Sequence, residues 1–156
     1  MCYEYRQFLE FIHQKGGRMH TNQKKLWLTT FVVFVWFYLF DWLFHGMFMK
    51  ETYMATSQFW RSETEMMSYM PWMVFGHFFL ALMFTFIFTK GYEHKGTAEG
   101  FRYGFYVSLF FNAPLLIWYA VMPYSLNMTL MWIAANFVKF IVGGLITSKT
   151  YTTATA

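Results

Sequence analysis

The stretch LWLTTFVVFVWFYLFDWLFHGMFM, residues 26–49, decides the fold. A transmembrane helix needs about 20 mostly apolar residues, and this stretch provides them with two ionisable interruptions, Asp41 and His45. These two residues are separated by one helical turn, so they share one face of the predicted helix. The stretch therefore predicts a membrane-spanning helix that carries polar groups on one side.

Three further stretches of the same kind follow, at residues 71–89, 103–122 and 128–147. Hydrophobic residues make up 57% of the 156 residues and charged residues only 13%, about half the charged share of a soluble domain. So few charged side chains cannot cover the surface of a water-soluble globule. We predict an all-α integral membrane protein whose four spans form one four-helix bundle over residues 26–149.

Basic residues are divided unequally between the two predicted sides of the membrane. Lys50 and Arg61 lie in the first connection, and the third connection has no basic residue. The other side carries Arg6, Lys15, Arg18, Lys24, Lys25, Lys90, Lys95, Arg102 and Lys149. The positive-inside rule then predicts that both termini are cytoplasmic and that the chain is a multi-pass protein of the inner (plasma) membrane. The basic side predicts contact with anionic membrane lipids rather than with nucleic acid.

Two segments flank the predicted bundle. Residues 1–25 form a basic cytoplasmic arm whose apolar residues predict a short amphipathic helix on the membrane surface. Residues 150–156 form a polar tail without recognisable pattern.

The connections contain signals for helix ends. Ser62 and Glu65 fit a capping box, which predicts a short interfacial helix within an outer segment over residues 50–70. Pro71 is expected to open the second span, where its missing N–H costs nothing. Thr97 is expected to cap the third span.

Polar residues of all four spans fall at similar depth in the outer half of the membrane. Counting about 1.5 Å per residue places Asp41 and His77 about 10 Å below the outer end, with the asparagines slightly deeper. Each lies on the face of its helix that also carries small residues, the faces expected to meet inside a bundle. This predicted polar layer consists of Asp41, His45, His77, Asn112, Asn136 and Lys139.

The polar layer admits two interpretations. A charge inside a bilayer costs at least a few kcal/mol when it is alone, so Asp41 is expected to pair with His77, with Lys139 or with both. The layer then fixes the order and register of the helices. The alternative is a proton or ion path, although the inner half offers only Thr30, Thr85 and Ser108 to continue it.

Methionines gather near the predicted outer face, and Met47 and Met49 lie next to His45. Thioethers and imidazole suit Cu(I), so these three residues are a candidate copper site. Haem is disfavoured because it needs two histidines at equal depth, whereas His45 and His77 differ by about 5 Å on the same count. We predict no resident cofactor.

The outer segment also offers apolar side chains for contact with another protein, namely Trp60, Met66, Met67 and Met70. Methionine adapts to irregular surfaces, which favours partner contact as the use of this rim. No nucleophile has an adjacent base in the sequence, so the chain is predicted not to be an enzyme.

The stretches FDWLFHGMFMK (40–50), MPWMVFGHFFLAL (70–82) and KGYEHKGTAEGFRYG (90–104) resemble small bacterial four-span membrane proteins of unknown function. The resemblance implies a topology and no site residues.

Taken together, these features predict a non-catalytic subunit or accessory protein packed against a larger membrane protein complex. A small transporter or channel that uses the polar layer is the first alternative. A copper-handling membrane factor is the second.

Overall fold

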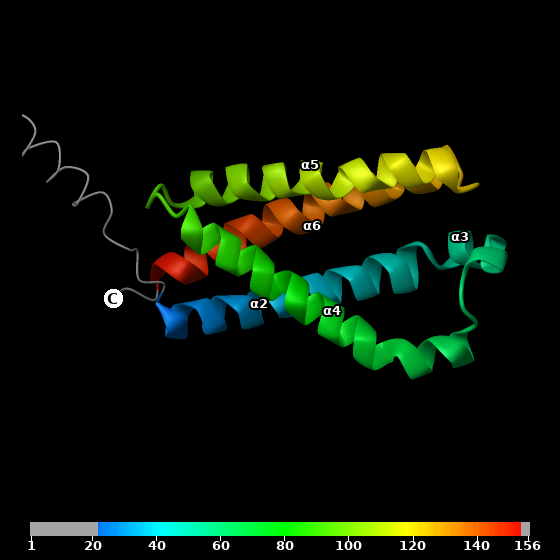
Figure 1. Cartoon of the computed structure of the whole chain (residues 1–156), viewed down its shortest axis with the longest axis horizontal. Helices are drawn as coiled ribbons and strands as arrows, with labels where there is room; N and C mark the ends of the chain where they lie inside the picture. Colours follow the sequence, from blue (N-terminus) through cyan, green and yellow to red (C-terminus); the bar gives the residue numbers. More distant parts are fainter. Residues whose placement is uncertain (1–21, 154–156) are drawn as a thin grey trace, which may run out of the picture.

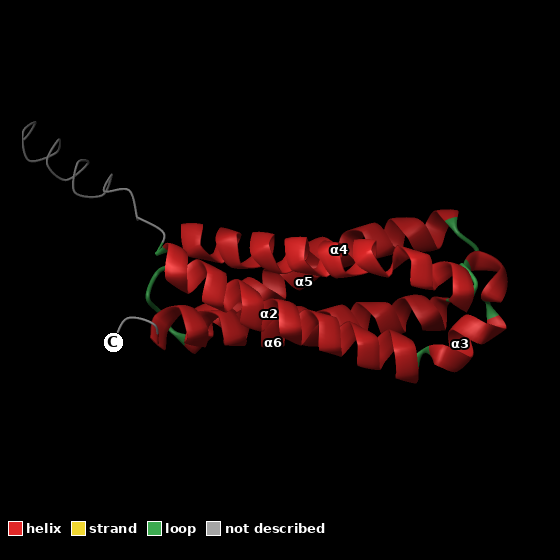
Figure 2. Ribbon diagram, turned by 90° about the horizontal axis from the view of Figure 1, so that it is seen from below, coloured by secondary structure: helices red, strands yellow, loops and turns green. Residues whose placement is uncertain are grey.

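The computed structural model describes residues 22–153, and every regular element within them is helical (Figures 1 and 2). Residues 1–21 of the predicted arm and residues 154–156 of the predicted tail lie outside this range. The four long helices are α2 (Gln23–Leu43), α4 (Glu63–Lys90), α5 (Thr97–Val121) and α6 (Leu126–Thr153). Between α2 and α4 lie the π-helical turn η1 (Phe44–Phe48), the short helix α3 (Lys50–Ala55) and the 3-10 turn η2 (Ser57–Phe59).

Four helical segments are long and apolar enough to cross a membrane, which indicates a multi-pass membrane protein. Their bounds are Gln23–Phe48, Glu63–Lys90, Thr97–Val121 and Leu126–Tyr151. Three of these helices begin earlier than the predicted spans 71–89, 103–122 and 128–147. The residues before each predicted span are helical, but they are too polar to be included in a hydropathy-based span. Residues 150–153 of the predicted tail also continue α6 instead of leaving it.

The start of α4 corrects the predicted separate interfacial helix and the predicted role of Pro71. The Ser62 hydroxyl accepts the backbone N–H of Glu65 at 3.3 Å, as a capping box requires, but the helix it caps runs on without a break to Lys90. Pro71 therefore lies inside α4. It removes one helix hydrogen bond, to the carbonyl of Met67 four residues earlier.

The connection between α4 and α5 is held by a buried carboxylate. Thr97 is the first helical residue and not the cap, which is Gly96 with a φ of +66°. The Glu99 carboxylate accepts the backbone N–H groups of Glu93 and Lys95 at 2.6 and 3.0 Å. At the surface, hydrogen bonds from Lys95 and from Arg102 lower the pKa of Glu93 to about 2.

Glycines bring α5 and α6 into close contact. A Cβ atom at Gly104 would lie 2.2 Å from the carbonyl oxygen of Phe140, and one at Gly144 would lie 2.1 Å from that of Gly100. No side chain fits at these distances, so the backbones themselves touch. This is the small-residue packing typical of membrane helices.

The hydrophobic core joins α2, α4 and α6 and extends from the middle of the molecule into the half where α2 begins. Its buried residues are Val33, Phe37, Ala81, Phe84 and Phe140. The Phe37 ring lies edge-on to Phe84 and to Phe140, with centroid distances of 5.2 and 5.4 Å. This half is the inner half in the predicted orientation, and the opposite half is called the outer half below.

The outer half of α4 takes no part in this packing. Every residue of the segment 63–76 is exposed except Met70, which is half-buried, whereas the inner half of α4 buries Ala81, Phe84 and Phe88. Figure 1 shows α4 crossing α2, with the start of α4 lying apart from α5 and α6. The last residues of α5, 116–121, are also exposed. Helix α4 is therefore packed along its inner half and uncovered along its outer half.

Candidate functional site

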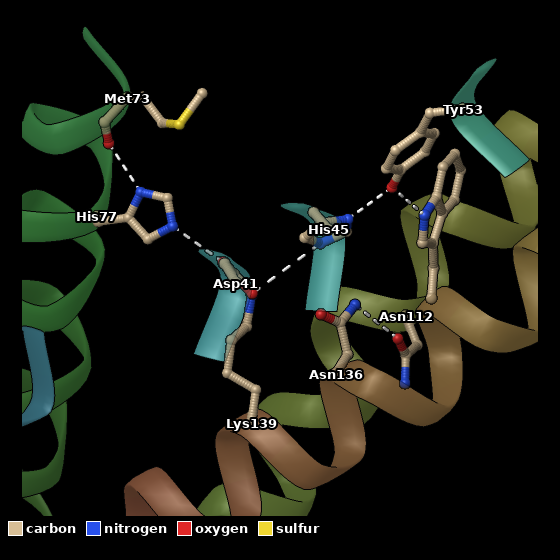
Figure 3. A network of polar contacts seen from close by, with 9 residues as sticks. Asp41, His45, Tyr53, Met73, His77, Asn112, Asn136 and Lys139 are labelled. Carbon is tan, nitrogen blue, oxygen red and sulfur yellow. Dashed lines mark hydrogen bonds and ion pairs between the residues drawn. The ribbon is translucent and has the colours of Figure 1, made fainter. Parts of the chain in front are cut away.

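Asp41 of α2 is the centre of a charged cluster within the spans (Figure 3). The Lys139 ammonium on α6 donates to both carboxylate oxygens, at 3.1 and 3.0 Å. The Nε2 atom of His77 on α4 lies 2.9 Å from Oδ2 of the same carboxylate. The prediction that Asp41 pairs with His77 and Lys139 is confirmed, and one carboxylate ties three helices together.

The surroundings of His77 identify its protonation state. Its Nδ1 atom lies 2.7 Å from the carbonyl oxygen of Met73, and its Nε2 atom faces the Asp41 carboxylate. A carbonyl and a carboxylate ionised by its contact with Lys139 can only accept hydrogen bonds. Both ring nitrogens must then donate, which requires the imidazolium form. One carboxylate with one ammonium and one imidazolium leaves a net charge of +1.

The charged cluster is largely shielded. The side chains of Asp41 and His77 are each 16% exposed and that of Lys139 is 10% exposed. The indole N–H of Trp36 donates to the backbone carbonyl of Lys139 at 2.9 Å, which fixes the turn of α6 that carries the ammonium. A partly shielded cluster interacts more strongly with a further charge than a group in water does.

His45 belongs to a second group of polar contacts, on the other side of Asp41. Its Nδ1 atom lies 2.5 Å from the hydroxyl of Tyr53 on α3, which also accepts the indole N–H of Trp132 at 2.9 Å. Its Nε2 atom is 4.0 Å from Asp41, beyond hydrogen-bond distance. Burial raises the pKa of Tyr53, so the phenol stays protonated at neutral pH.

The chain forms a π-helical turn at His45. The turn spans Phe44–Phe48 and closes with the backbone N–H of Met49 donating to the carbonyl of Phe44 at 2.9 Å. A π-turn changes the direction in which the following side chains point, and such turns are frequent at functional sites. Here it directs His45 to Tyr53 instead of into hydrogen-bond contact with Asp41.

Asn112 and Asn136 form a separate pair between α5 and α6. The Asn136 amide donates to Asn112 Oδ1 at 2.9 Å, and the Asn112 amide reaches the carbonyl of Ile133 at 3.4 Å. The predicted polar layer thus consists of three groups, centred on Asp41, on Tyr53 and on the asparagine pair. Tyr53 and Trp132 were not predicted, because one follows the first span and the other carries no polar pattern around it.

A groove of about 310 Å³ opens beside the charged cluster, on the face formed by α2 and α4. It is lined by Asp41, Trp72, Met73, Gly76, His77 and Leu80. The Trp72 side chain is 71% exposed, and a Cβ added at Gly76 would meet nothing within 4 Å. The groove therefore connects the charged cluster to whatever surrounds the outer half of α4.

The candidate copper ligands have different surroundings. Met47 is 63% exposed whereas Met49 is fully buried, and His45 is engaged by Tyr53. Within residues 22–153, no three His, Cys, Asp or Glu side chains are grouped to hold a metal ion. At Asp41 the Lys139 ammonium already holds the position that a cation would take.

The predicted partner-contact residues divide into two kinds. Trp60 is half-buried, because its ring packs on Tyr53, Tyr124 and Trp132 and its indole N–H donates to the Thr56 hydroxyl. It therefore belongs to the internal packing of the outer rim. The exposed or half-buried set on α4 is Met66, Met67 and Met70.

No model of a known protein family, no curated protein and no solved structure matches this chain. Its function is therefore argued from the geometry above.

Proposed function

We propose that this chain is a non-catalytic subunit of a larger membrane protein complex, and that the outer half of α4 is its contact surface. The observation that carries the proposal is the exposure of the segment 63–76 around its whole circumference, apart from half-buried Met70. A helix of a folded protein normally buries one face against its neighbours. This segment has large apolar side chains on several faces, including Met67, Trp72 and Phe75.

The orientation that we propose has both ends of the chain in the cytoplasm of a bacterial inner membrane. In Figure 1 the start of α2 and the end of α6 lie at the same end of the molecule. That end carries six basic residues, Lys24, Lys25, Lys90, Lys95, Arg102 and Lys149, whereas Lys50 and Arg61 lie toward the other end. The positive-inside rule supports this orientation.

The experiment for a subunit role is purification of the tagged chain from its native membranes in a mild detergent. The proposal predicts that larger membrane subunits co-purify in fixed proportion and that the assembly exceeds the 18.8 kDa of this chain. A monodisperse monomer or homodimer under the same conditions would contradict it.

Ion or proton transport is a second candidate, because intramembrane Asp, His and Lys residues are typical of transport sites. The charged cluster lies toward the outer half, and the aromatic core of Phe37, Phe84 and Phe140 follows it on the inner side. A through path would have to open that core. Proton flux into liposomes that is abolished by Asp41→Asn would favour transport, and absence of flux would favour the subunit role.

A further inference from the structure

We propose that the partner contributes a transmembrane helix that docks along the outer half of α4 and places a carboxylate next to His77. This inference rests on the proposed subunit function and deepens it. It names the surface, the kind of partner and the charge that the partner must bring. Three observations support it: the charge of the cluster, the position of the His77 Nδ1–H group at the groove, and a glycine that contacts nothing in this chain.

The first observation is the hydrogen-bond geometry of Asp41, His77 and Lys139, which assigns the cluster one carboxylate, one imidazolium and one ammonium and hence a net charge of +1. Among the described residues, no second carboxylate pairs with either cation. An uncompensated charge inside a bilayer is strongly unfavourable. A carboxylate from outside the chain would neutralise the cluster at the place where it meets the groove.

The second observation is the direction of the Nδ1–H group of His77. It donates to the carbonyl of Met73, which is four residues earlier on the same helix and thus already accepts a helix hydrogen bond. His77 and Met73 both line the groove. An incoming carboxylate can replace this weak acceptor with a charge-assisted hydrogen bond, while Nε2 stays on Asp41.

The third observation is Gly76, which adjoins His77. Glycine inside a helix is destabilising relative to alanine, and Gly100, Gly104 and Gly144 offset that cost by contact with a neighbouring backbone. Gly76 contacts nothing in this chain within 4 Å of an added Cβ. Small residues allow two membrane helices to approach closely, so Gly76 fits a helix supplied from outside.

A helix fits this surface better than a single lipid chain does. The exposed segment 63–76 is long, about 20 Å at 1.5 Å per residue. Along it Met66, Met70 and Met73 recur at intervals of four and three residues, which places them on one face. These methionines, followed by Gly76 and His77, form a continuous surface along which one face of a partner helix can pack.

The test is photo-crosslinking in native membranes with benzoylphenylalanine in place of Trp72, at the groove. The control carries the same residue in place of Phe110, an exposed aromatic residue of α5. The inference predicts a groove-specific crosslink to a transmembrane peptide of another protein that has an Asp or Glu within one turn of the crosslinked residue. Replacing that carboxylate with its amide should lower the crosslink yield about tenfold or more, as loss of a buried charge partner does.

The amide variant lies in the partner, so the result does not depend on whether this chain tolerates substitution. Crosslinks to lipid alone, to a peptide of this same chain, or to a helix without a nearby carboxylate would overturn the inference. If larger subunits co-purify while the groove crosslinks to none of them, the subunit role stands and the docking surface is wrong. If no larger subunit co-purifies, the subunit role and the docking surface are both wrong.

Discussion

The α5–α6 pair and the outer half of α4 use glycine in opposite ways. At Gly104 a Cβ atom would meet backbone at 2.2 Å, whereas at Gly76 it would meet nothing within 4 Å. Both glycines lie within apolar helices that can cross a membrane. The difference separates a helix contact that the chain completes by itself from a position that nothing in the chain covers, where we propose that the partner helix docks.

The largest expected effect on stability is at the contact between α5 and α6. Gly104→Leu should destabilise the protein by about 3 kcal/mol or more, because backbone and not a flexible side chain must move. Thermal unfolding in detergent, followed by circular dichroism, would measure it. Gly91→Ala is the control, since Gly91 has open space around it. Equal stability of the two variants would mean that the α5–α6 contact does not hold the fold.

The second largest effect on stability is expected at the charged cluster, which joins α4 to α6 through Asp41. Lys139→Met should cost about 2 kcal/mol, because Asp41 loses two hydrogen bonds from the ammonium while the His77 imidazolium still balances its charge. The double variant Asp41→Asn with Lys139→Met should lose less than the two single losses together, since the coupled charges are removed at once. Strict additivity in urea unfolding would show that the two groups do not interact.

These two predictions also show what the sequence could reveal. The spans were predictable because long apolar stretches have few other uses, and the pairing of Asp41 followed from the cost of a lone charge in lipid. Gly100 and Gly104 are four residues apart, a spacing that indicates close contact between membrane helices. Tyr53, Trp132 and the π-turn at His45 were not predictable, because they depend on how the rim folds back over the end of α2.

Helix ends were misplaced for a related reason. The capping box at Ser62 predicts a helix start, but the apolar stretch begins only at Pro71. The sequence pattern therefore divides α4 into two helices. Whether a capped polar turn continues into an apolar one is decided by the tertiary fold, which a hydropathy pattern does not contain.

A smaller effect is expected at the outer rim. Tyr53→Phe should cost about 1 kcal/mol, because it leaves the Trp132 indole N–H without its acceptor and His45 without its partner. Chemical unfolding monitored by tryptophan fluorescence would report the loss. Tyr119→Phe, at an exposed position of α5, is the matched control. If both variants unfold alike, the rim contacts contribute nothing to stability.

The smallest effect is at the surface turn before α5. Hydrogen bonds from Lys95 and Arg102 lower the pKa of Glu93 to about 2 from 4.5, so the ionised form stabilises the fold above about pH 4.5. This contribution should disappear as the pH falls through about 2. The difference in melting temperature between wild type and Glu93→Gln should be small at pH 7, as for other exposed ion pairs, and should vanish in acid. A difference that grows in acid would contradict the assignment.

The comparison between the two glycines is tested most directly by Gly76→Leu, purified from native membranes beside the wild type. We predict an unchanged melting temperature, because the new side chain enters open space. We also predict loss of the co-purifying subunits, because we propose that the partner helix docks in that space. A variant that unfolds as readily as Gly104→Leu, or one that keeps its full complement of partners, would contradict the account.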